Sequence, residues 1–364
     1  MTITGWGPFR IGLLALLVLG LLLVVREARR RRTRRTLLSA GLVLVLLTAN
    51  TLAAVNSHYG YFRTLGEALG VVRNLEPLSA LDRTTVPANG IVVQLPVPGN
   101  RSGFAARDAY VYVPPAWFHA PKPTLPVVML LHGLPGDPSG WVTSGEAQTT
   151  ADAYARAHDG RAPILVMPDI LGGFDNDTEC VDSVRGDVET YLTVDVPATV
   201  VPRLGTAPPG PQWAVAGFSL GGMCSLMLAL RHPELFPTFG DYGGLLGPRT
   251  GDDNDVGTTV ADLFADDEQA FRAHEPRTLL SRRRFDGSAG WFEMGGDDTL
   301  TRDSAQELAP LARAAGVETC FVVVPGFGHV GELWRRALRD SLPWLAARTG
   351  LTPPQPSDTS NCQN

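Results

Sequence analysis

The first 57 residues contain two long apolar runs separated by an arginine-rich loop. The first run, residues 6–25, contains a single charge at Arg10, and the second, residues 36–55, contains none. As a helix, each run spans about 30 Å, the thickness of the hydrocarbon core of a bilayer. The loop at 26–35 has seven Arg and one Glu, a composition typical of cytoplasmic loops. We therefore predict two transmembrane helices, with everything after residue 57 outside the cytoplasm.

A cleaved signal peptide is the main alternative for this segment. Its arginines, apolar stretch and small residues at 51–54 fit that pattern, but the second apolar run is longer than a signal peptide needs.

The charged residues are unevenly distributed along the chain. Of the 31 basic and 37 acidic side chains, residues 1–35 hold eight Arg and one Glu, so the remainder has 23 basic and 36 acidic ones. Such an acidic body repels phosphate backbones, so we expect no nucleic acid as a partner. The basic end beside the apolar runs points instead to a lipid bilayer.

The exported part divides into three segments by composition. Residues 58–85 are predicted to form a stalk, residues 86–351 the main domain, and residues 352–364 a polar, Pro-rich, disordered tail. The stalk contains a stripe of apolar residues at helical spacing, which can lie on the membrane surface or pack on the main domain. The members of this stripe are Tyr61, Leu65, Leu69 and Val72.

Short β-rich runs alternate with helical stretches through the main domain, which is typical of an α/β sheet. Several runs, such as ILVM at 164–167, are continuously apolar, as central strands covered on both faces are. The predicted strands are residues 91–95, 109–113, 126–131, 164–167, 213–217, 291–294 and 320–324. Residues 245–285 form a long connection with a predicted helix at 260–273, and insertions of this kind often shape a pocket mouth.

Ser219 lies in the segment AVAGFSLGGMCSLMLAL, where an apolar strand runs into a G-x-S-x-G motif and then into a helical pattern. A serine at such a tight turn projects its hydroxyl above the sheet. Gly217 and Gly221 are needed because a Cβ at either position would clash with the neighbouring strand and helix. The helix N-terminus favours developing negative charge, so this context makes Ser219 a candidate nucleophile.

A second motif, HGLPG at residues 132–136, follows the apolar strand VVMLL. In this architecture the loop after that strand supplies one oxyanion-hole N–H, and the residue after the nucleophile supplies the other. We assign these donors to the backbone amides of Leu134 and Leu220. Each donor typically contributes about 3 kcal/mol to transition-state stabilisation.

A serine nucleophile also needs a base and an acid that orients the base. Asp297 and Asp298 follow the predicted strand at 291–294, and His329 follows the last predicted strand. Adjacent residues leaving a strand point in opposite directions, so only one of the two Asp side chains can face His329. The acidic runs elsewhere in the chain lack the ligand spacing of a Ca²⁺ loop, so no metal site is predicted.

Residues 86–350 resemble the putative esterase family of α/β-hydrolases, which includes S-formylglutathione hydrolases, enterochelin esterases and mycobacterial mycolyltransferases. The matching stretches are ARDAYVYVPPAWF, LLHGLPGDPSGW, DVETYLTVDVP, GFSLGG, GGDD and GFGH. The resemblance implies an α/β-hydrolase fold and carboxylic-ester chemistry without a cofactor, with Ser219 as nucleophile and His329 as base. It favours Asp298 as the acid, three places after a Gly at the strand end. The match to mycolyltransferases at Gly140-Trp141 and Glu189-Thr190 makes Trp141 a candidate substrate contact.

Three functions are open on this basis. The first is a membrane-anchored extracytoplasmic serine esterase or envelope acyltransferase, acting on an ester or acyl-lipid substrate through an acyl-enzyme. The second is a non-catalytic binding module on the same fold, whose signature would be a lost triad residue. The third makes the two spans the functional part, as an anchor for a partner. The complete set Ser219, Asp298 and His329 favours the first.

Four Cys residues allow three disulfide pairings in an exported domain. Cys224 lies in the helix after Ser219, and Cys320 begins a strand several strands away, so a bond between these two is not expected. We expect Cys224 to be a buried thiol, whereas a bond between Cys180 and Cys362 stays open.

Overall fold

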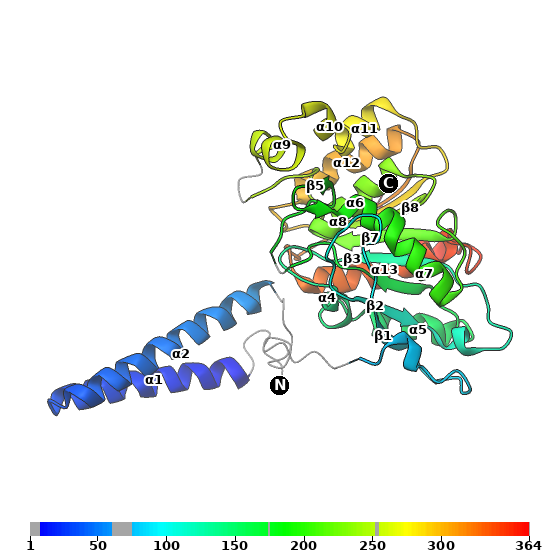
Figure 1. Cartoon of the computed structure of the whole chain (residues 1–364). Coiled ribbons are helices and arrows are strands. Elements are labelled where there is room, and N and C mark those ends of the chain that lie inside the picture. The colour runs from blue at the N-terminus through cyan, green and yellow to red at the C-terminus, as the bar shows by residue number, and fades with distance from the viewer. Residues whose placement is uncertain (1–7, 60–74, 174, 252–254, 364) are drawn as a thin grey trace. The chain divides into compact units, whose positions relative to one another are not determined.

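The computed structural model describes residues 8–59, 75–173, 175–251 and 255–363, which divide into two compact units (Figure 1). In the first unit, α1 (Pro8–Arg29) and α2 (Thr33–Tyr59) pack along each other as a hairpin. Both helices are long and apolar enough to cross a membrane. The predicted apolar stripe of the stalk, from Tyr61 to Val72, lies outside the described residues.

The second unit is built on an eight-stranded sheet with the order β1-β2-β4-β3-β7-β8-β9-β10. From β4 onward in this order all neighbours are parallel, whereas β1 and β2 are antiparallel at one edge. The predicted mostly parallel sheet is thereby confirmed. The strands are β1 (Ile91–Leu95), β2 (Ala109–Val113), β3 (Val127–Leu131), β4 (Ile164–Met167), β7 (Trp213–Phe218), β8 (Thr238–Tyr242), β9 (Ala289–Gly295) and β10 (Glu318–Val324), with a separate ribbon of β5 (Asp182–Ser183) and β6 (Gly186–Asp187).

Ten further helices and four short helical turns accompany the sheet in the described part of this unit. The helices are α4 (Ser139–Val142), α5 (Ala147–Ala157), α6 (Val188–Thr190), α7 (Val196–Leu204), α8 (Leu220–Arg231), α9 (Val256–Phe264), α10 (Glu268–Arg272), α11 (Pro276–Arg282), α12 (Arg302–Ala314) and α13 (Gly331–Arg348). The turns are η1 (Leu78–Ala80), η2 (Pro115–Phe118), η3 (Tyr191–Asp195) and η4 (Pro356–Thr359).

Helices cover both faces of the sheet. Neighbouring side chains of a strand point to opposite faces, and two neighbours in β8, Asp241 and Tyr242, meet different helices. The Tyr242 hydroxyl hydrogen-bonds Ser341 of α13 at 2.6 Å. The Asp241 carboxyl instead lies against the backbone of Gly222 in α8. Helix α5 packs with α13, and α11 contacts both α8 and α12.

Strand β8 is not predicted by the sequence, because it contains Gly240 and Asp241, two residue types depleted from strands. All five of its residues are nevertheless buried. A Cβ on Gly240 would stand 2.8 Å from the Tyr242 hydroxyl, so the glycine leaves room for the tyrosine on the same face. Tertiary packing therefore overrides the low strand propensity of this segment.

The described residues of the connection between β8 and β9 form three helices, where the sequence predicts one at 260–273. Helix α9 ends where Ala265 and Asp266 both adopt positive φ angles, 49° and 64°. Asp267 then starts α10 by accepting hydrogen bonds from two N–H groups of its first turn. Two consecutive left-handed residues cannot continue a right-handed helix, so the predicted helix is divided.

The described part of the predicted stalk, residues 75–85, packs on the main domain. The Gln94 N–H donates to the Glu76 carbonyl, Pro77 forms a β-bridge with Gln94, and Leu78 is buried. This segment therefore extends the sheet edge at β1.

The C-terminal tail is ordered over the described residues 352–363, so the disorder predicted from its composition is wrong for them. Turn η4 is capped by reciprocal bonds between Gln355 and Asp358. A disulfide from Cys362 to Cys320 attaches the tail to edge strand β10. This covalent link orders a polar, Pro-rich segment that buries too little apolar surface to order itself.

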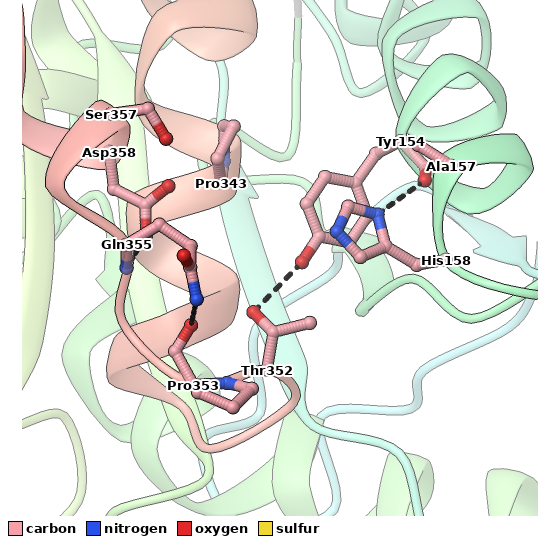
Figure 2. Close-up of a pocket in the computed structure, with 9 residues that line it drawn as sticks. All are labelled: Tyr154, Ala157, His158, Pro343, Thr352, Pro353, Gln355, Ser357 and Asp358. Atoms are coloured by element: carbon pink, nitrogen blue, oxygen red, sulfur yellow. Dashed lines mark hydrogen bonds between the residues drawn. The ribbon is translucent and has the colours of Figure 1, made fainter.

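The tail also forms one wall of a cavity of about 480 Å³ (Figure 2). On the opposite wall, the rings of Tyr154 and His158 stack with their centroids 3.9 Å apart. The Tyr154 hydroxyl hydrogen-bonds the Thr352 hydroxyl of the tail at 3.1 Å. Tyr154 and His158 lie at the end of α5, which leads into the amino end of β4. The cavity that they line therefore lies toward the amino ends of the parallel strands.

The other two cysteines, Cys180 and Cys224, are bonded to each other, with Cα atoms 5.8 Å apart. The expected buried thiol at Cys224 is therefore wrong, and Cys180 does not pair with Cys362. The physical reason is that the long loop after β4 folds against α8, a proximity that sequence spacing does not encode. The expectation that Cys224 and Cys320 are not bonded to each other is confirmed.

Candidate active site

Ser219 occupies the sharp turn between β7 and α8, with φ 54° and ψ −124°. Such a backbone costs a non-glycine residue about 1–3 kcal/mol and persists only where the surroundings enforce it. A Cβ on Gly217 would stand 2.3 Å from the Gly221 carbonyl oxygen, and one on Gly221 would stand 2.3 Å from the Leu131 carbonyl oxygen. The two glycines therefore permit the turn that holds the Ser219 hydroxyl at the carboxyl edge of the sheet.

The side chain of His329 connects two other loops at this edge. Its Nε2 atom lies 2.9 Å from Ser219 Oγ, and its Nδ1 atom lies 2.9 Å from Asp298 Oδ2. Because a carboxylate only accepts, Nδ1 is assigned the proton, and the Ser219 hydroxyl donates to Nε2. Residues from the ends of β7, β9 and β10 thus form one hydrogen-bonded chain.

Asp298 is held in place by its own turn as well as by His329. Its side chain is fully buried, and its oxygens accept from the N–H groups of Leu300 and Thr301 and from the Thr301 hydroxyl. Burial alone would raise the pKa of Asp298, but the hydrogen bonds and charge of His329 and the bonds from Thr301 lower it below its ordinary value. The carboxylate is therefore ionised at neutral pH and can stabilise an imidazolium.

Asp297 lies in the same turn, but its side chain is exposed. Its N–H donates to the Phe327 carbonyl at 2.9 Å, which joins this turn to the loop that carries His329. Gly295 allows the close approach, since a Cβ there would stand 2.1 Å from the Phe327 carbonyl oxygen. The structure therefore brings Asp298, and not Asp297, to His329.

The loop after β3 lies beside the serine, because a Cβ on Gly133 would stand 3.4 Å from the Ser219 Cβ. Within the described residues, neither the Leu134 N–H nor the Leu220 N–H has a hydrogen-bond acceptor. Leu220 is the first residue of α8, so its amide belongs to the unpaired first turn of that helix. Both amides are therefore available to a substrate oxygen near Ser219.

Trp141 cannot contact a substrate, contrary to the expectation from the sequence, because its side chain is fully buried. Its indole N–H donates to the Leu131 carbonyl at 2.9 Å, and its ring packs edge-on against Phe218 at 5.0 Å. Phe218 stacks on Trp334, whose ring meets the His329 ring edge-on at 5.3 Å. These aromatic side chains form the packed floor beneath the candidate site.

Two polar residues near the site, Arg107 and Asp169, are not predicted from the sequence. Asp169 is fully buried and forms a two-point ion pair with Arg107, at 2.9 Å and 2.6 Å. Asp169 Oδ1 also lies 3.3 Å from His132 Nε2. The available signal was the position of Asp169 just after the apolar strand β4, at the edge where parallel strands present functional residues.

Glu189, which the sequence resemblance includes, lies at the opposite end of α8 from Ser219. Its carboxylate meets Arg231 Nε at 2.6 Å, His232 Nε2 at 2.6 Å and His274 Nε2 at 2.9 Å. Burial would raise the pKa of Glu189, but these three partners lower it well below its ordinary value. The cluster joins α6, the end of α8 and the segment just after α10.

No group of three or more His, Cys, Asp or Glu side chains gathers as a metal site in the described ranges. The Ser219 hydroxyl can act as a nucleophile, His329 as the base in contact with it, and the ionised Asp298 carboxylate as the group that orients this base. Two free N–H groups lie on the neighbouring segments. This combination can carry out acyl transfer through a covalent intermediate.

A sequence profile of the putative esterase family matches residues 105–345. An uncharacterized protein of Corynebacterium glutamicum is 36% identical over 338 residues, which cover 88% of this chain and 78% of that protein. The diacylglycerol acyltransferase/mycolyltransferase of Mycobacterium leprae is 27% identical over 195 residues, which cover 45% of this chain and 57% of that protein. The solved S-formylglutathione hydrolase of Agrobacterium tumefaciens superposes with a TM-score of 0.61 at 19% identity, over 73% of this chain and 98% of that one. This likeness confirms the predicted α/β-hydrolase fold.

Proposed function

The chain belongs to the putative esterase family, and from this premise we propose that it is a membrane-anchored serine esterase whose catalytic domain lies outside the cytoplasm. Membership makes it a serine carboxylic-ester hydrolase or acyltransferase. The observation that carries the proposal is the hydrogen-bonded chain from Asp298 through His329 to Ser219, with both His329 contacts at 2.9 Å.

In the first half of the reaction, His329 Nε2 takes the proton of the Ser219 hydroxyl while Oγ attacks the ester carbonyl carbon. The carbonyl oxygen becomes an oxyanion that accepts hydrogen bonds from the Leu134 and Leu220 amides. His329 then gives its proton to the departing alkoxide, which leaves as an alcohol. Asp298 stays ionised and stabilises the imidazolium between these two transfers.

In the second half, a hydroxyl group attacks the acyl-enzyme, and His329 again acts first as base and then as acid. Water as the attacking group releases a carboxylic acid and restores the Ser219 hydroxyl. No metal or other cofactor takes part in these steps, so turnover should be insensitive to chelators.

An acyltransferase is the second candidate, and the match to the Mycobacterium leprae diacylglycerol acyltransferase/mycolyltransferase favours it. In that case an alcohol instead of water attacks the acyl-enzyme. The two candidates are separated by product analysis: a transferase forms a new ester when a lipid alcohol is present, whereas an esterase releases free acid.

The membrane anchor and the outside location are supported by two features of the chain. The seven Arg residues at 26–35 lie at the end of α1, in the short connection and at the start of α2, and they favour a cytoplasmic location for this turn. All four cysteines of the second unit are in disulfides, which form and persist in oxidising compartments. The substrate would then be an ester or acyl lipid at the outer face of the membrane.

The catalytic proposal is tested with a fluorophosphonate probe and a short activated ester, using the full chain in detergent. The wild type should be labelled on Ser219 and turn over the ester, whereas Ser219→Ala should lose labelling and about 10⁶-fold in kcat. Ser225→Ala is the matched control, because the Ser225 hydroxyl only donates to the Gly221 carbonyl of the same helix. A folded Ser219→Ala protein that keeps more than about 1% of the activity would contradict the proposal. An unlabelled, inactive wild type would favour the binding-module alternative.

The topology is tested by fusing reporters after residue 85. A phosphatase that is active only outside the cytoplasm should be active there, and a reporter that is active only inside should be silent. The reverse result would overturn the outside location without affecting the assignment of Ser219.

A further inference from the structure

His132 is buried behind the loop that carries the Leu134 amide, with 1% of its surface exposed. The Ile170 N–H donates to its Nε2 atom at 3.2 Å, and its Nδ1 atom lies 2.9 Å from the Gly133 carbonyl oxygen. An amide N–H can only donate and a carbonyl can only accept. The two contacts therefore assign the proton to Nδ1, which donates to the Gly133 carbonyl.

The nearby Asp169 carboxylate does not need a proton from His132. Its oxygens accept from the Arg107 guanidinium and from the N–H groups of Arg107, Leu171 and Gly172. These bonds satisfy the carboxylate without the 3.3 Å approach to His132 Nε2, which has no proton to donate in this arrangement. Since the Ile170 N–H is directed at Nε2, the ring nitrogen that donates to Gly133 is Nδ1.

The Gly133 carbonyl and the Leu134 N–H belong to the same planar peptide group. This peptide bond is not among the cis bonds of the chain, so its C=O and N–H point in opposite directions. A hydrogen bond that holds the carbonyl toward His132 therefore directs the N–H away from it. The Gly133 position lies beside Ser219, since a Cβ there would stand 3.4 Å from the serine Cβ.

The other end of this loop is held by Arg107. Its Nη2 atom donates to the Gly136 carbonyl at 3.0 Å and to Asp169 Oδ1 at 2.6 Å. Residues 133–136 are thus attached at both ends to groups that the loop after β4 positions.

We propose that His132 is a positioning residue that aims the Leu134 N–H at the substrate oxyanion through the Gly133 carbonyl. The inference rests on the proposed function. The hydrogen bond to the carbonyl also polarises the peptide, which makes its N–H a stronger donor. His132 itself is too deeply buried to touch substrate, so its effect must pass through the Gly133–Leu134 peptide.

Two amide substitutions separate the roles of the two ring nitrogens. In His132→Asn, the amide nitrogen stands near the position of Nδ1 and can still donate to the Gly133 carbonyl. In His132→Gln, the amide reaches the position of Nε2 and can accept from Ile170, but the donor to Gly133 is lost. Both variants replace the ring by a polar side chain, so each is the control for the other.

The full chain in detergent is assayed with a short activated ester and with a boronic acid, which forms a tetrahedral adduct on a nucleophilic serine. We expect His132→Gln to lose at least about tenfold in kcat, since loss of one oxyanion donor costs about 10²–10³-fold. Its KM should stay within about twofold, and its affinity for the boronic acid should fall in parallel with kcat/KM. His132→Asn should recover most of the lost kcat.

Equal kcat values for the two variants, or a change in KM alone, would overturn the positioning role. If His132→Gln shows no thermal unfolding transition, His132→Phe takes its place, because it keeps a planar ring and removes the donor to the Gly133 carbonyl. An unchanged kcat in that variant would likewise overturn the inference. Fluorophosphonate labelling separates the two proposals: an unlabelled wild type refutes the esterase, whereas a labelled wild type with unaffected variants refutes only the positioning role.

Discussion

A disulfide joins Cys180, at the end of the loop after β4, to Cys224, which lies five residues after Ser219 in α8. Asp169 lies near the start of the same loop, and its carboxylate holds Arg107 against the Gly136 carbonyl of the loop after β3. The covalent bond therefore fixes one end of a loop whose other end supports the candidate site. The bond between Cys320 and Cys362 lies elsewhere, between the edge strand and the tail.

These two disulfides provide a matched pair of tests. They span 44 and 42 residues, so loop-closure entropy predicts a similar loss of about 4 kcal/mol in the free energy of unfolding when either is replaced by two Ser. We expect Cys180→Ser/Cys224→Ser to lower kcat as well, because it releases the loop beside Ser219. Thermal unfolding and ester turnover of the full chain measure both effects. Equal effects of the two double variants on kcat would contradict this expectation.

Replacing the tail disulfide should affect stability without affecting chemistry. In Cys320→Ser/Cys362→Ser, the tail loses its covalent attachment to β10, and the unfolding temperature should fall while KM and kcat stay within about twofold. Protease sensitivity of residues 352–363 should rise, because this polar segment buries little apolar surface. A tail that stays protease-resistant would show that η4 and its capping bonds are sufficient to hold it.

Asp298→Asn and Asp297→Asn should have very different consequences. Asp298 accepts the His329 Nδ1–H, so its amide replacement should lower kcat by about 10⁴ through the wrong imidazole tautomer. Asp297 is exposed and contributes its backbone N–H to the turn, which the substitution preserves. The kcat of Asp297→Asn should therefore stay within a few-fold of the wild-type value. The larger loss at Asp297 would reverse the choice of the acid and leave Ser219 and His329 unaffected.

Glu293 should make the protein less stable as the pH rises. Burial raises the pKa of this carboxyl to about 8, and one of its oxygens has no hydrogen-bond partner among the described residues. Between pH 4.5 and about 8 the folded state holds a proton that the unfolded state releases, so the free energy of unfolding falls by up to about 1.4 kcal/mol per pH unit. Glu293→Gln should remove this slope in unfolding experiments between pH 5 and pH 9. Glu318→Gln, at a 64% exposed side chain, is the control and should leave the slope unchanged.

Glu189 should affect stability at the acidic end of the pH range. Because its partners lower the pKa of Glu189 below the ordinary value of 4.5, the folded state binds fewer protons than the unfolded state in acid. Its contribution to the free energy of unfolding is present above pH 4.5 and is lost as the pH falls below that value. Glu189→Gln should lower the unfolding temperature at pH 7 and weaken its decline in acid. A variant as stable as the wild type at pH 7 would show that the cluster with Arg231, His232 and His274 contributes nothing.

Several features could be predicted because they depend on residues close together in the chain. The strand, turn and helix around Ser219 follow from the small volume that Gly217 and Gly221 leave, and both predicted clashes have counterparts in the structure. The choice between Asp297 and Asp298 follows from the alternation of side chains at a strand end, combined with the family resemblance. The apolar N-terminal runs form α1 and α2 because their composition and length already favour helix.

Other features depend on which segments become neighbours, and only the tertiary structure decided these. Strand β8 is a strand because its Gly240 and Asp241 lie between packed neighbours. Trp141 is buried because β7 and β8 bring Phe218 and Tyr242 against its ring. The partner of each cysteine and the contact of His132 with Ile170 join residues tens of positions apart. Local patterns of residue type and spacing act over a few residues. The sequence by itself therefore determined most of the strands, the order of Ser219, Asp298 and His329 and the turn that exposes the serine. The pairings between distant loops depend on strand order and side-chain packing, which no local pattern contains.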